Sequence, residues 1–414
     1  MKTPFLERLG AVLSPSWFFA GIALGMTLCI AAGHWAARQG TYTERPRFFC
    51  KLSPEGAIYP TLDNLCEYVR HRAPRDKVLV LVCGSSISLG CGQKNALLWT
   101  NRLQERLGPG FAVVNVAFRS CFFASVGVPL AEILSREYPR WYLVSDLAFT
   151  NAPSWLFDPK GVYPYRYLLW QGRAEGLLQP NAQRDEELKS VLFSKDEAIR
   201  HCAEEDALRA LLEREFKACS LWNWIGDYHF FPVYSLLLSP RVPFWTPRER
   251  LIDDESDAVP MPERMDRIRE HELALLRATM HGVGNTDPAQ RFSSFKTHPV
   301  YAETLGKMVS DPAFRAHMLF LLNTKCPYFI ERLDNEERSR YLQSIHDDAA
   351  SLNALGLRTI PIGLGYNTED YWDLSHFSNS AAPKMAAEVS AKLLDMARRD
   401  GIPFKSTAAP RHAQ

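Results

Sequence analysis

Three side chains of this 414-residue sequence stand in contexts that suit nucleophilic catalysis: Ser86, Asp373 and His376. Ser86 follows the apolar run KVLVLVC, which is typical of a buried strand. Asp373 and His376 lie three residues apart in YWDLSHFSN. A serine nucleophile needs a base within hydrogen-bond reach, and the base needs a group that orients it. On one loop, an aspartate at this spacing bonds the imidazole Nδ1 and leaves Nε2 facing the serine.

Each of these signals also has a structural interpretation. Gly84-Ser85-Ser86 is compatible with a plain tight turn, and Asp373 with a helix cap beside an exposed histidine. Ser85 and Ser88 are alternative hydroxyls, which we interpret as turn-forming. We favour the catalytic interpretation because functional groups collect at the carboxyl ends of parallel strands, where both pieces are predicted to lie.

The other residues that could carry chemistry form no recognisable motif. There is no HExxH, Walker loop or GxGxxG, and GSSISLGCG lacks the lysine of a phosphate-binding loop. We expect no metal and no cofactor. Five scattered histidines are interpreted as surface or internally satisfied side chains: His201, His229, His271, His281 and His298. With 48 basic and 47 acidic residues, the chain shows no charge pattern for nucleic acid, and none is expected as a partner.

The order of predicted elements indicates an α/β fold. Strands at KVLVLVC, FAVVNVAF and RWYLVSDLAF alternate with helices at KNALLWTNRLQERLG and VPLAEILSREYP. In the first of these helices, Ala96, Trp99, Leu103 and Leu107 are expected to share one face. Later segments add a helix at RSRYLQSIHDDAASLNALG, a strand at LRTIPIGLG and a terminal helix at AAPKMAAEVSAKLLDMARR. This alternation predicts a doubly wound parallel sheet in a three-layer α/β/α arrangement.

The chain divides into predicted segments with different compositions. We expect a cytoplasmic N-terminus at 1–15, a transmembrane anchor at 16–37 and a linker with a short helix at 38–76. The α/β domain is expected in two parts, at 77–150 and 338–400, separated by a mostly helical insertion at 151–337. The last segment, 401–414, is expected to be a flexible tail. The insertion contains the aromatic stretch LWNWIGDYHFFPVYSLLLSPRVPFW, interpreted as packing, with a surface for membrane headgroups as the alternative.

The N-terminal segment has the features of a membrane anchor. No charged side chain lies between Arg8 and Arg38, and Trp17 and Trp35 stand near the ends of the apolar stretch. A cleaved signal peptide is the alternative, since small residues at positions 31, 32 and 36 suit a peptidase. A buried soluble helix is the third interpretation. The flanking positive charges do not determine the orientation.

Cysteine usage gives a weaker indication of the compartment. Outside the predicted anchor there are eight cysteines, an even number that suits disulfides in an oxidising environment. Cys83, inside a predicted strand, is interpreted as a small apolar side chain.

The serine and Asp-x-x-His blocks resemble those of the SGNH/GDSL hydrolase superfamily. Its serine follows the first strand in a Gly-Asp-Ser motif, matched here by Gly84-Ser85-Ser86, and its Asp-x-x-His lies near the C-terminus, matched by Asp373 and His376. The resemblance implies that Ser86 is the nucleophile, with its own N–H as an oxyanion donor. It further implies that His376 is the base and that Asp373 orients it. It covers about residues 77–150 and 338–400.

The sequence departs from the family pattern at three points. Ser85 replaces the usual aspartate. In the second block, which begins at Asn115, Ser120 stands where a glycine N–H helps to form the oxyanion hole. The third block, Gly-x-Asn-Asp, is absent from LVSDLAFTN, which leaves Asn151 as the candidate side-chain donor and Asp146 as a poorer one.

An N-terminal anchor joined to such a domain is similar to membrane-anchored cell-envelope O-acyltransferases of the alginate O-acetyltransferase-like and DltD-like type. The resemblance implies acyl transfer, with O-acetyl the expected group, through an acyl-Ser86 intermediate. The implied substrate is an envelope glycan or acylated carrier, and the implied partner is a multi-spanning membrane acyltransferase. The domain is then expected on the periplasmic or extracellular side of the cytoplasmic membrane. The alternatives are a membrane-tethered esterase of carbohydrate or lipid, and a non-catalytic glycan-binding or scaffold protein.

Overall fold

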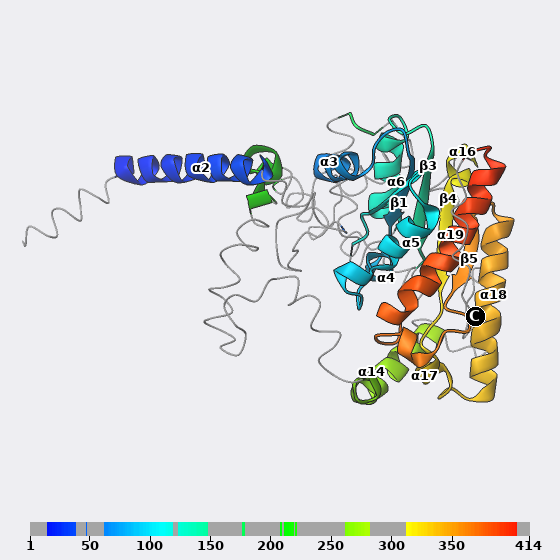
Figure 1. Cartoon of the computed structure of the whole chain (residues 1–414). Coiled ribbons are helices and arrows are strands. Elements are labelled where there is room, and N and C mark those ends of the chain that lie inside the picture. The colour runs from blue at the N-terminus through cyan, green and yellow to red at the C-terminus, as the bar shows by residue number, and fades with distance from the viewer. Residues whose placement is uncertain are drawn as a thin grey trace, which may run out of the picture. The chain divides into compact units, whose positions relative to one another are not determined.

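The computed structural model of the chain describes residues 15–38, 47, 62–118, 123–147, 176–178, 208, 211–218, 220–221, 261–281 and 312–403. These residues belong to two compact units (Figure 1). One unit contains helix α2 and the described residues between 208 and 221, and the other contains the remaining described residues.

The larger unit is built on a five-stranded parallel sheet with the order β2-β1-β3-β4-β5. The strands are β1 (Val78–Cys83), β2 (Phe111–Asn115), β3 (Trp141–Asp146), β4 (Met318–Asn323) and β5 (Thr359–Ile362). Strand β2 pairs with one edge of β1, and β3 pairs with the other edge. The carboxyl ends of β1 and β3 therefore form the topological switch point at which open α/β sheets commonly place functional groups. The α/β prediction is confirmed.

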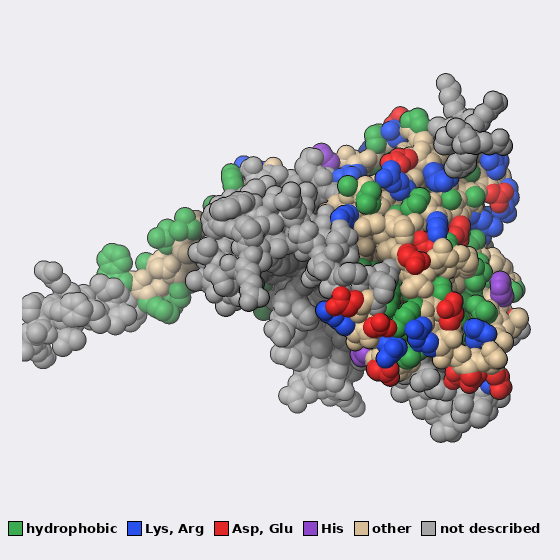
Figure 2. Space-filling view, turned by 60° about the horizontal axis from the view of Figure 1, so that its bottom comes forward, with side chains coloured by type: hydrophobic (Ala, Val, Ile, Leu, Met, Phe, Trp, Pro, Cys, Tyr) green, Lys and Arg blue, Asp and Glu red, His purple; other side chains and the backbone are tan. Residues whose placement is uncertain are grey.

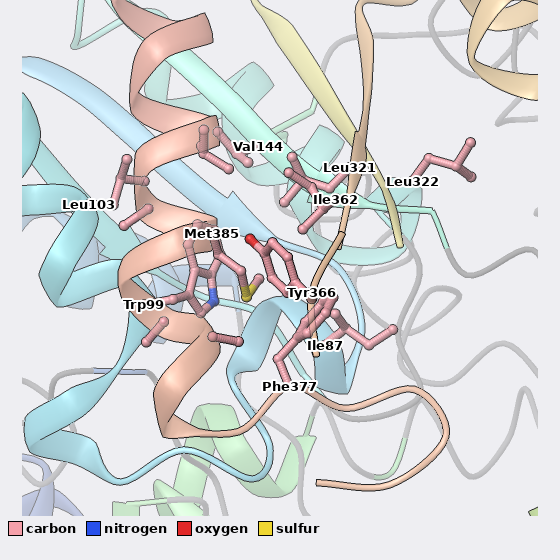
Figure 3. Packing of buried hydrophobic residues seen from close by; sticks show 14 of the residues in the cluster. Ile87, Trp99, Leu103, Val144, Leu321, Leu322, Ile362, Tyr366, Phe377 and Met385 are labelled. Atoms are coloured by element: carbon pink, nitrogen blue, oxygen red, sulfur yellow. The ribbon is translucent and has the colours of Figure 1, made fainter. Parts of the chain in front are cut away.

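Helices cover both faces of the sheet. Helices α5 (Trp99–Leu107) and α19 (Ala382–Arg399) pack on the face that carries Val80 and Val82 (Figure 3). On the other face, α6 (Phe123–Leu134) approaches β1 so closely that a Cβ on Gly127 would lie 2.1 Å from Sγ of Cys83. Helix α3 (Leu62–Arg72) packs on α6, and α18 (Asn335–Ala354) packs beside β5.

Two sequence predictions for this unit need correction. Strand β4 lies inside the segment 151–337 that was assigned to a helical insertion, so the sheet domain resumes before residue 338. Helix α5 begins at Trp99, after a short 3₁₀ turn, so Ala96 is exposed and does not share the helical face. In the predicted tail, only residues 401–403 are described.

Helix α2 (Pro15–Arg38) is long and apolar enough to cross a membrane. Its large apolar side chains are exposed, with Trp17 at 68% and Leu24 at 62%, which argues against a buried core helix (Figure 2). At its C-terminal end, Gly33 permits a close approach of the backbone at Phe216, whose carbonyl oxygen would lie 1.8 Å from an added Cβ. A signal sequence near the N-terminus can have a helix of this kind too.

Several of the described cysteines are free thiols, although the even cysteine count suits disulfides. Cys66, Cys83 and Cys326 are buried free thiols. Burial raises the pKa of the Cys66 and Cys326 thiols to about 12, so both are uncharged at neutral pH. The even cysteine count therefore does not mean that every cysteine outside α2 is paired. Cys50, Cys121, Cys202 and Cys219 lie outside the described residues.

We predict that Gly127→Ala destabilises the larger unit through the contact with Cys83. Helix propensity alone would favour alanine by about 1 kcal/mol, but overpacking against a buried strand costs about 1–3 kcal/mol. Urea unfolding of the full chain in detergent measures the difference. Gly110→Ala is the matched control, because nothing lies within 4 Å of its added Cβ. Cys83→Ala in the Gly127→Ala background should recover part of the loss, and additivity of the two changes would contradict the contact.

Candidate active site

The turn after β1 displays Ser86 and depends on Gly84. Gly84 has φ +113°, and an added Cβ would lie 2.3 Å from Oδ1 of Asp146. Ser85 is the N-cap of the one-turn helix α4 (Ser86–Leu89), and its Oγ accepts a hydrogen bond from the N–H of Ile87. Ser85 and Ser88 are buried, whereas Ser86 is partly exposed. Among these three hydroxyls, that of Ser86 is the one accessible to a substrate.

The structure brings the three predicted catalytic side chains into one hydrogen-bonded chain. Oγ of Ser86 lies 2.7 Å from Nε2 of His376, and Nδ1 of His376 lies 2.6 Å from Oδ2 of Asp373. Because a carboxylate accepts from Nδ1–H, Nε2 is the ring nitrogen that accepts from the Ser86 hydroxyl. The side chains of His376 and Asp373 are 25% and 17% exposed, so the pair is sheltered but reachable.

Asp373 is fixed by its own loop. Its Oδ1 accepts hydrogen bonds from the backbone N–H groups of Ser375, at 2.8 Å, and His376, at 2.7 Å. Burial by itself would raise the pKa of Asp373, but the His376 ring and these N–H groups outweigh it and lower the pKa below its usual value. The alternative of a helix cap is wrong, since Ser378 is the N-cap of the 3₁₀ turn that follows. Asp373 is therefore an ionised carboxylate that orients the histidine.

The loop that carries His376 has to cross the sheet. Two strands separate β1 from β5, so the strand ends are about 14 Å apart at a spacing of about 4.8 Å per strand. Gly363, with φ +93°, starts the crossing directly after β5. Over β4, the hydroxyls of Thr324 and Tyr371 bond at 2.7 Å, and the N–H of Cys326 donates to the carbonyl of Leu374 at 2.9 Å.

The two loops that carry Ser86 and His376 are also joined to each other. Nε2 of Gln93 donates to the Ser378 carbonyl, and the N–H of Lys94 donates to Oδ1 of Asn379 at 2.8 Å. Ile87 and Phe377, the residues that follow Ser86 and His376, belong to the same buried cluster (Figure 3). Packing of Ile87 and Phe377 in this cluster holds the Ser86 hydroxyl and the His376 imidazole close to each other.

Asp146 is buried and holds the nucleophile turn. Its Oδ1 accepts the N–H of Ser85 at 2.8 Å and that of Ser88 at 3.3 Å, and its Oδ2 accepts the Ser85 hydroxyl at 2.6 Å. Burial raises the pKa of Asp146, and these hydrogen bonds oppose the rise. Because both oxygens are occupied by the turn, Asp146 is not available as the oxyanion donor that the sequence left open.

Three further side chains support α4 from other parts of the chain. Nδ2 of Asn115, at the end of β2, donates to the Ser88 carbonyl at 3.1 Å, as does the indole N–H of Trp99 at 3.0 Å. Arg47 is buried, and its guanidinium donates to the carbonyls of Leu89 and Gly90. Sequence reasoning missed Arg47, because a lone arginine in a predicted linker gives no signal of burial.

The oxyanion donors are described only in part. The N–H of Ser86 is at the first turn of α4, where a helix leaves its N–H groups without intrahelical acceptors. Ser120 and Asn151 lie outside the described residues. The carboxyl end of β4 contributes Asn323, whose amide nitrogen and oxygen are both buried and have no hydrogen-bond partner among the residues that the structure describes. Sequence reasoning missed this asparagine because it missed β4.

Helix α14 (Met261–His281) and the segment after β4 add two charged residues near the triad, Glu272 and Lys325, which sequence reasoning also missed. Within the described part of the chain, no cluster of three metal-ligating side chains occurs. His271 is exposed on α14, while His201, His229 and His298 lie outside the described residues.

Comparison with known proteins does not identify a family for this chain. The chain matches no protein-family model, no curated protein and no solved structure.

We predict that Asp146→Ala destabilises the chain by about 2–4 kcal/mol, because it leaves the buried N–H groups of Ser85 and Ser88 without an acceptor. Asp146→Asn keeps one carbonyl oxygen and should cost less. Asp395→Ala is the control, since its ion pair with Arg399 is exposed and contributes at most about 1 kcal/mol. Denaturant titration of the full chain measures the free energy of unfolding of the three variants. Equal stability of the two alanine variants would rule out the proposed role of Asp146.

Proposed function

We propose that the chain is a membrane-anchored serine acyltransferase or esterase of the SGNH type, with Ser86 as nucleophile, His376 as base and Asp373 as orienting carboxylate. The observation that carries the proposal is the continuous chain of short hydrogen bonds from the accessible Ser86 hydroxyl through His376 to Asp373. The topology also supports the proposal, since the loops that follow β1, β4 and β5 lie at the carboxyl edge of one parallel sheet.

The proposed reaction has two steps with one covalent intermediate. His376 Nε2 takes the proton from Ser86 as Oγ attacks the acyl carbonyl carbon, and the tetrahedral intermediate carries an oxyanion. The bond to the leaving alcohol then breaks, and His376 returns the proton to that oxygen. In the second step an acceptor hydroxyl, or water, gives its proton to His376 and attacks the acyl-Ser86 ester. The bond between the acyl carbon and Ser86 Oγ then breaks, His376 returns the proton to Oγ, and the acylated product leaves.

Asp373 favours this proton transfer electrostatically. An ionised carboxylate 2.6 Å from Nδ1 stabilises the imidazolium that forms in each step. For the oxyanion, the N–H of Ser86 is the first proposed donor. Asn323 is a candidate second donor, because its buried amide lies at the same edge of the sheet and no described residue bonds it. Ser120 and Asn151 remain the candidates that the family resemblance implies.

The substrate class is proposed from the anchor together with the resemblance. A helix able to span a bilayer would keep the domain at a membrane surface, where acylated carriers and envelope glycans are found. The proposed acceptor is an envelope carbohydrate hydroxyl, the proposed acyl group is acetyl, and a multi-spanning acyltransferase is the proposed source of the acyl group. A tethered esterase uses the same site with water as acceptor. Faster deacylation of acyl-Ser86 by an alcohol than by water would separate the transferase from the esterase.

We predict that a fluorophosphonate probe labels the full chain at Ser86 and that Ser86→Ala abolishes labelling. His376→Gln should slow labelling by at least about 100-fold, since it removes the general base. Ser351→Ala on α18 is the matched control and should label as wild type, because its hydroxyl only bonds a carbonyl of its own helix. A folded wild-type chain that stays unlabelled would refute the proposed nucleophile, and labelling that persists in Ser86→Ala would move it to another residue.

We predict that the C-terminal domain is exported. Alkaline phosphatase fused to the C-terminus should be active, and a green fluorescent protein fused at the same point should be dark, because each folds productively on one side of the membrane only. The reverse pattern would place the domain in the cytoplasm and remove envelope carbohydrate as the substrate. Detection of the intact N-terminus by mass spectrometry would distinguish an anchor from a cleaved signal peptide.

A further inference from the structure

Arg47 is a buried arginine that comes from outside the helices and strands of the larger unit. It lies nine residues after the end of α2 at Arg38 and fifteen before the start of α3, in the segment that the sequence assigns to a linker. It belongs nevertheless to the larger unit, and only 6% of it is exposed. Its backbone forms a parallel bridge with Asn115 at the carboxyl end of β2. Arginine is almost never fully buried unless it is paired, so its partners indicate what it does.

The partners of the Arg47 guanidinium are backbone carbonyls at the end of α4. Nη1 donates to the carbonyl of Leu89 at 3.1 Å and to that of Gly90 at 2.9 Å, and Nη2 donates to that of Gln93 at 3.4 Å. Leu89 is the last residue of α4, and Gly90 is its C-cap. A planar guanidinium with five donors suits such a set of neighbouring carbonyls better than a lysine ammonium does.

Helix α4 needs external donors because it is a single turn of four residues. The last four carbonyls of any helix have no intrahelical donor, and here they are all the carbonyls that the helix has. The first two accept from backbone N–H groups that follow the helix. The third accepts from the side chains of Asn115 and Trp99. The fourth, that of Leu89, accepts from Arg47, which therefore holds the last residue of the helix that begins at Ser86.

The third carbonyl that Arg47 binds belongs to a residue that joins the two loops of the proposed site. Nε2 of Gln93 donates to the carbonyl of Ser378 at 3.3 Å. Ser378 lies two residues after His376 in the same loop. The guanidinium thus contacts the turn of Ser86 directly and, through Gln93, the loop of His376.

We propose that Arg47 is a positioning residue, which keeps the hydroxyl of Ser86 within hydrogen-bond reach of the His376 ring. It does so by fixing the C-terminal end of α4 and the turn at Gln93. The inference deepens the proposed function and rests on Ser86 acting as nucleophile. It also assigns a residue between the anchor and α3 to the support of the proposed active site. A displacement of reacting groups by about 1 Å can lower a rate by about 100-fold, so a support of this kind affects the reaction.

The test compares the full chain in detergent with its variants Arg47→Met and Arg47→Lys. Methionine keeps an apolar chain and removes every donor, whereas lysine keeps the charge and loses the planar fork. Tyr138→Phe is the matched control, because the Tyr138 hydroxyl also donates to the carbonyl of a buried residue, Ala73, at 2.7 Å. Tyr138 precedes β3 and Ala73 precedes β1, so this hydrogen bond lies at the amino edge of the sheet, opposite the proposed active site.

The first measurement is fluorophosphonate labelling, at a temperature at which every variant is folded. We expect Arg47→Met to lower the first-order labelling constant at saturating probe by about 10-fold or more, because bound probe meets a displaced hydroxyl. Arg47→Lys should fall between Arg47→Met and wild type. Tyr138→Phe should label as wild type although it also loses a buried hydrogen bond, since a loss of stability alone does not change the rate of a folded chain.

The second measurement is amide hydrogen exchange, read by mass spectrometry of peptides from the folded chain. Three N–H groups between 89 and 91 bond carbonyls of the α4 turn, so their exchange reports its opening. We expect Arg47→Met to speed exchange by about 10-fold or more in peptides that cover 84–93 and 373–380, while peptides from α18 keep the wild-type rate. A uniform loss of stability would instead speed exchange in α18 as well.

The two measurements separate the failure of this inference from that of the proposed function. A wild-type chain that stays unlabelled refutes the nucleophile, and faster exchange confined to the two loops would still support the hold of Arg47 on them. A labelled chain whose labelling rate does not respond to Arg47→Met, or responds equally to Tyr138→Phe, overturns the inference and keeps the nucleophile. If Arg47→Met does not fold, Arg47→Lys carries both measurements, with a smaller effect in the same direction.

Discussion

The arrangement of the site depends on one buried carboxylate, that of Asp146. It accepts hydrogen bonds from two backbone N–H groups and one hydroxyl of the turn after β1, so it determines how the chain leaves the strand. Asp146 belongs to β3, the neighbour of β1, and the bond therefore spans the topological switch point. Gly84 has no side chain because Asp146 occupies that space. The exposure of Ser86, and the burial of Ser85 and Ser88 beside it, follow from this contact.

A second constraint is the distance between the ends of β1 and β5, the strands that precede Ser86 and His376. His376 comes from beyond β5, and its loop reaches Ser86 only by lying across β4, where Thr324 and Cys326 bind it. The segment after β4 therefore supports the base and also contributes Lys325. The same edge of the sheet thus supplies the proposed nucleophile after β1, its support from β3, a cation after β4 and the proposed base after β5. Each function is assigned to a different strand end, as the geometry of parallel sheets allows.

The sequence was sufficient for the parts of this arrangement that depend on local pattern. Continuous apolar runs predicted β1, β2 and β3, and the Asp-x-x-His spacing predicted a pair that the structure joins to Ser86. It was insufficient for β4, because the apolar run MLFLLN follows a long segment with helical patterns, and periodicity alone does not distinguish such a run from a buried helix segment. Asn323 and Lys325 were missed for the same reason, because both lie at the end of this strand or directly after it. Their partners come from elements that are distant in the sequence, and no spacing along the chain reports that Lys325 bonds Ser375.

Asp146 and Asp373 show how one sheet edge can give two buried carboxylates different properties. Asp373 has a lowered pKa, so its contribution to stability is present above the usual aspartate value and is lost as the pH falls through its folded pKa. Asp146 has a raised pKa, so its ionisation costs stability at neutral pH, and this cost disappears as the pH falls toward the unfolded value. The difference lies in the partners: Asp373 faces an imidazole that can become a cation, whereas Asp146 meets only neutral donors. A carboxylate that has to stabilise a transient positive charge needs to be ionised. One that only shapes a turn does not need to be ionised. The position next to Ser86 is taken by Ser85, and the carboxylate that Ser85 binds is supplied by the neighbouring strand.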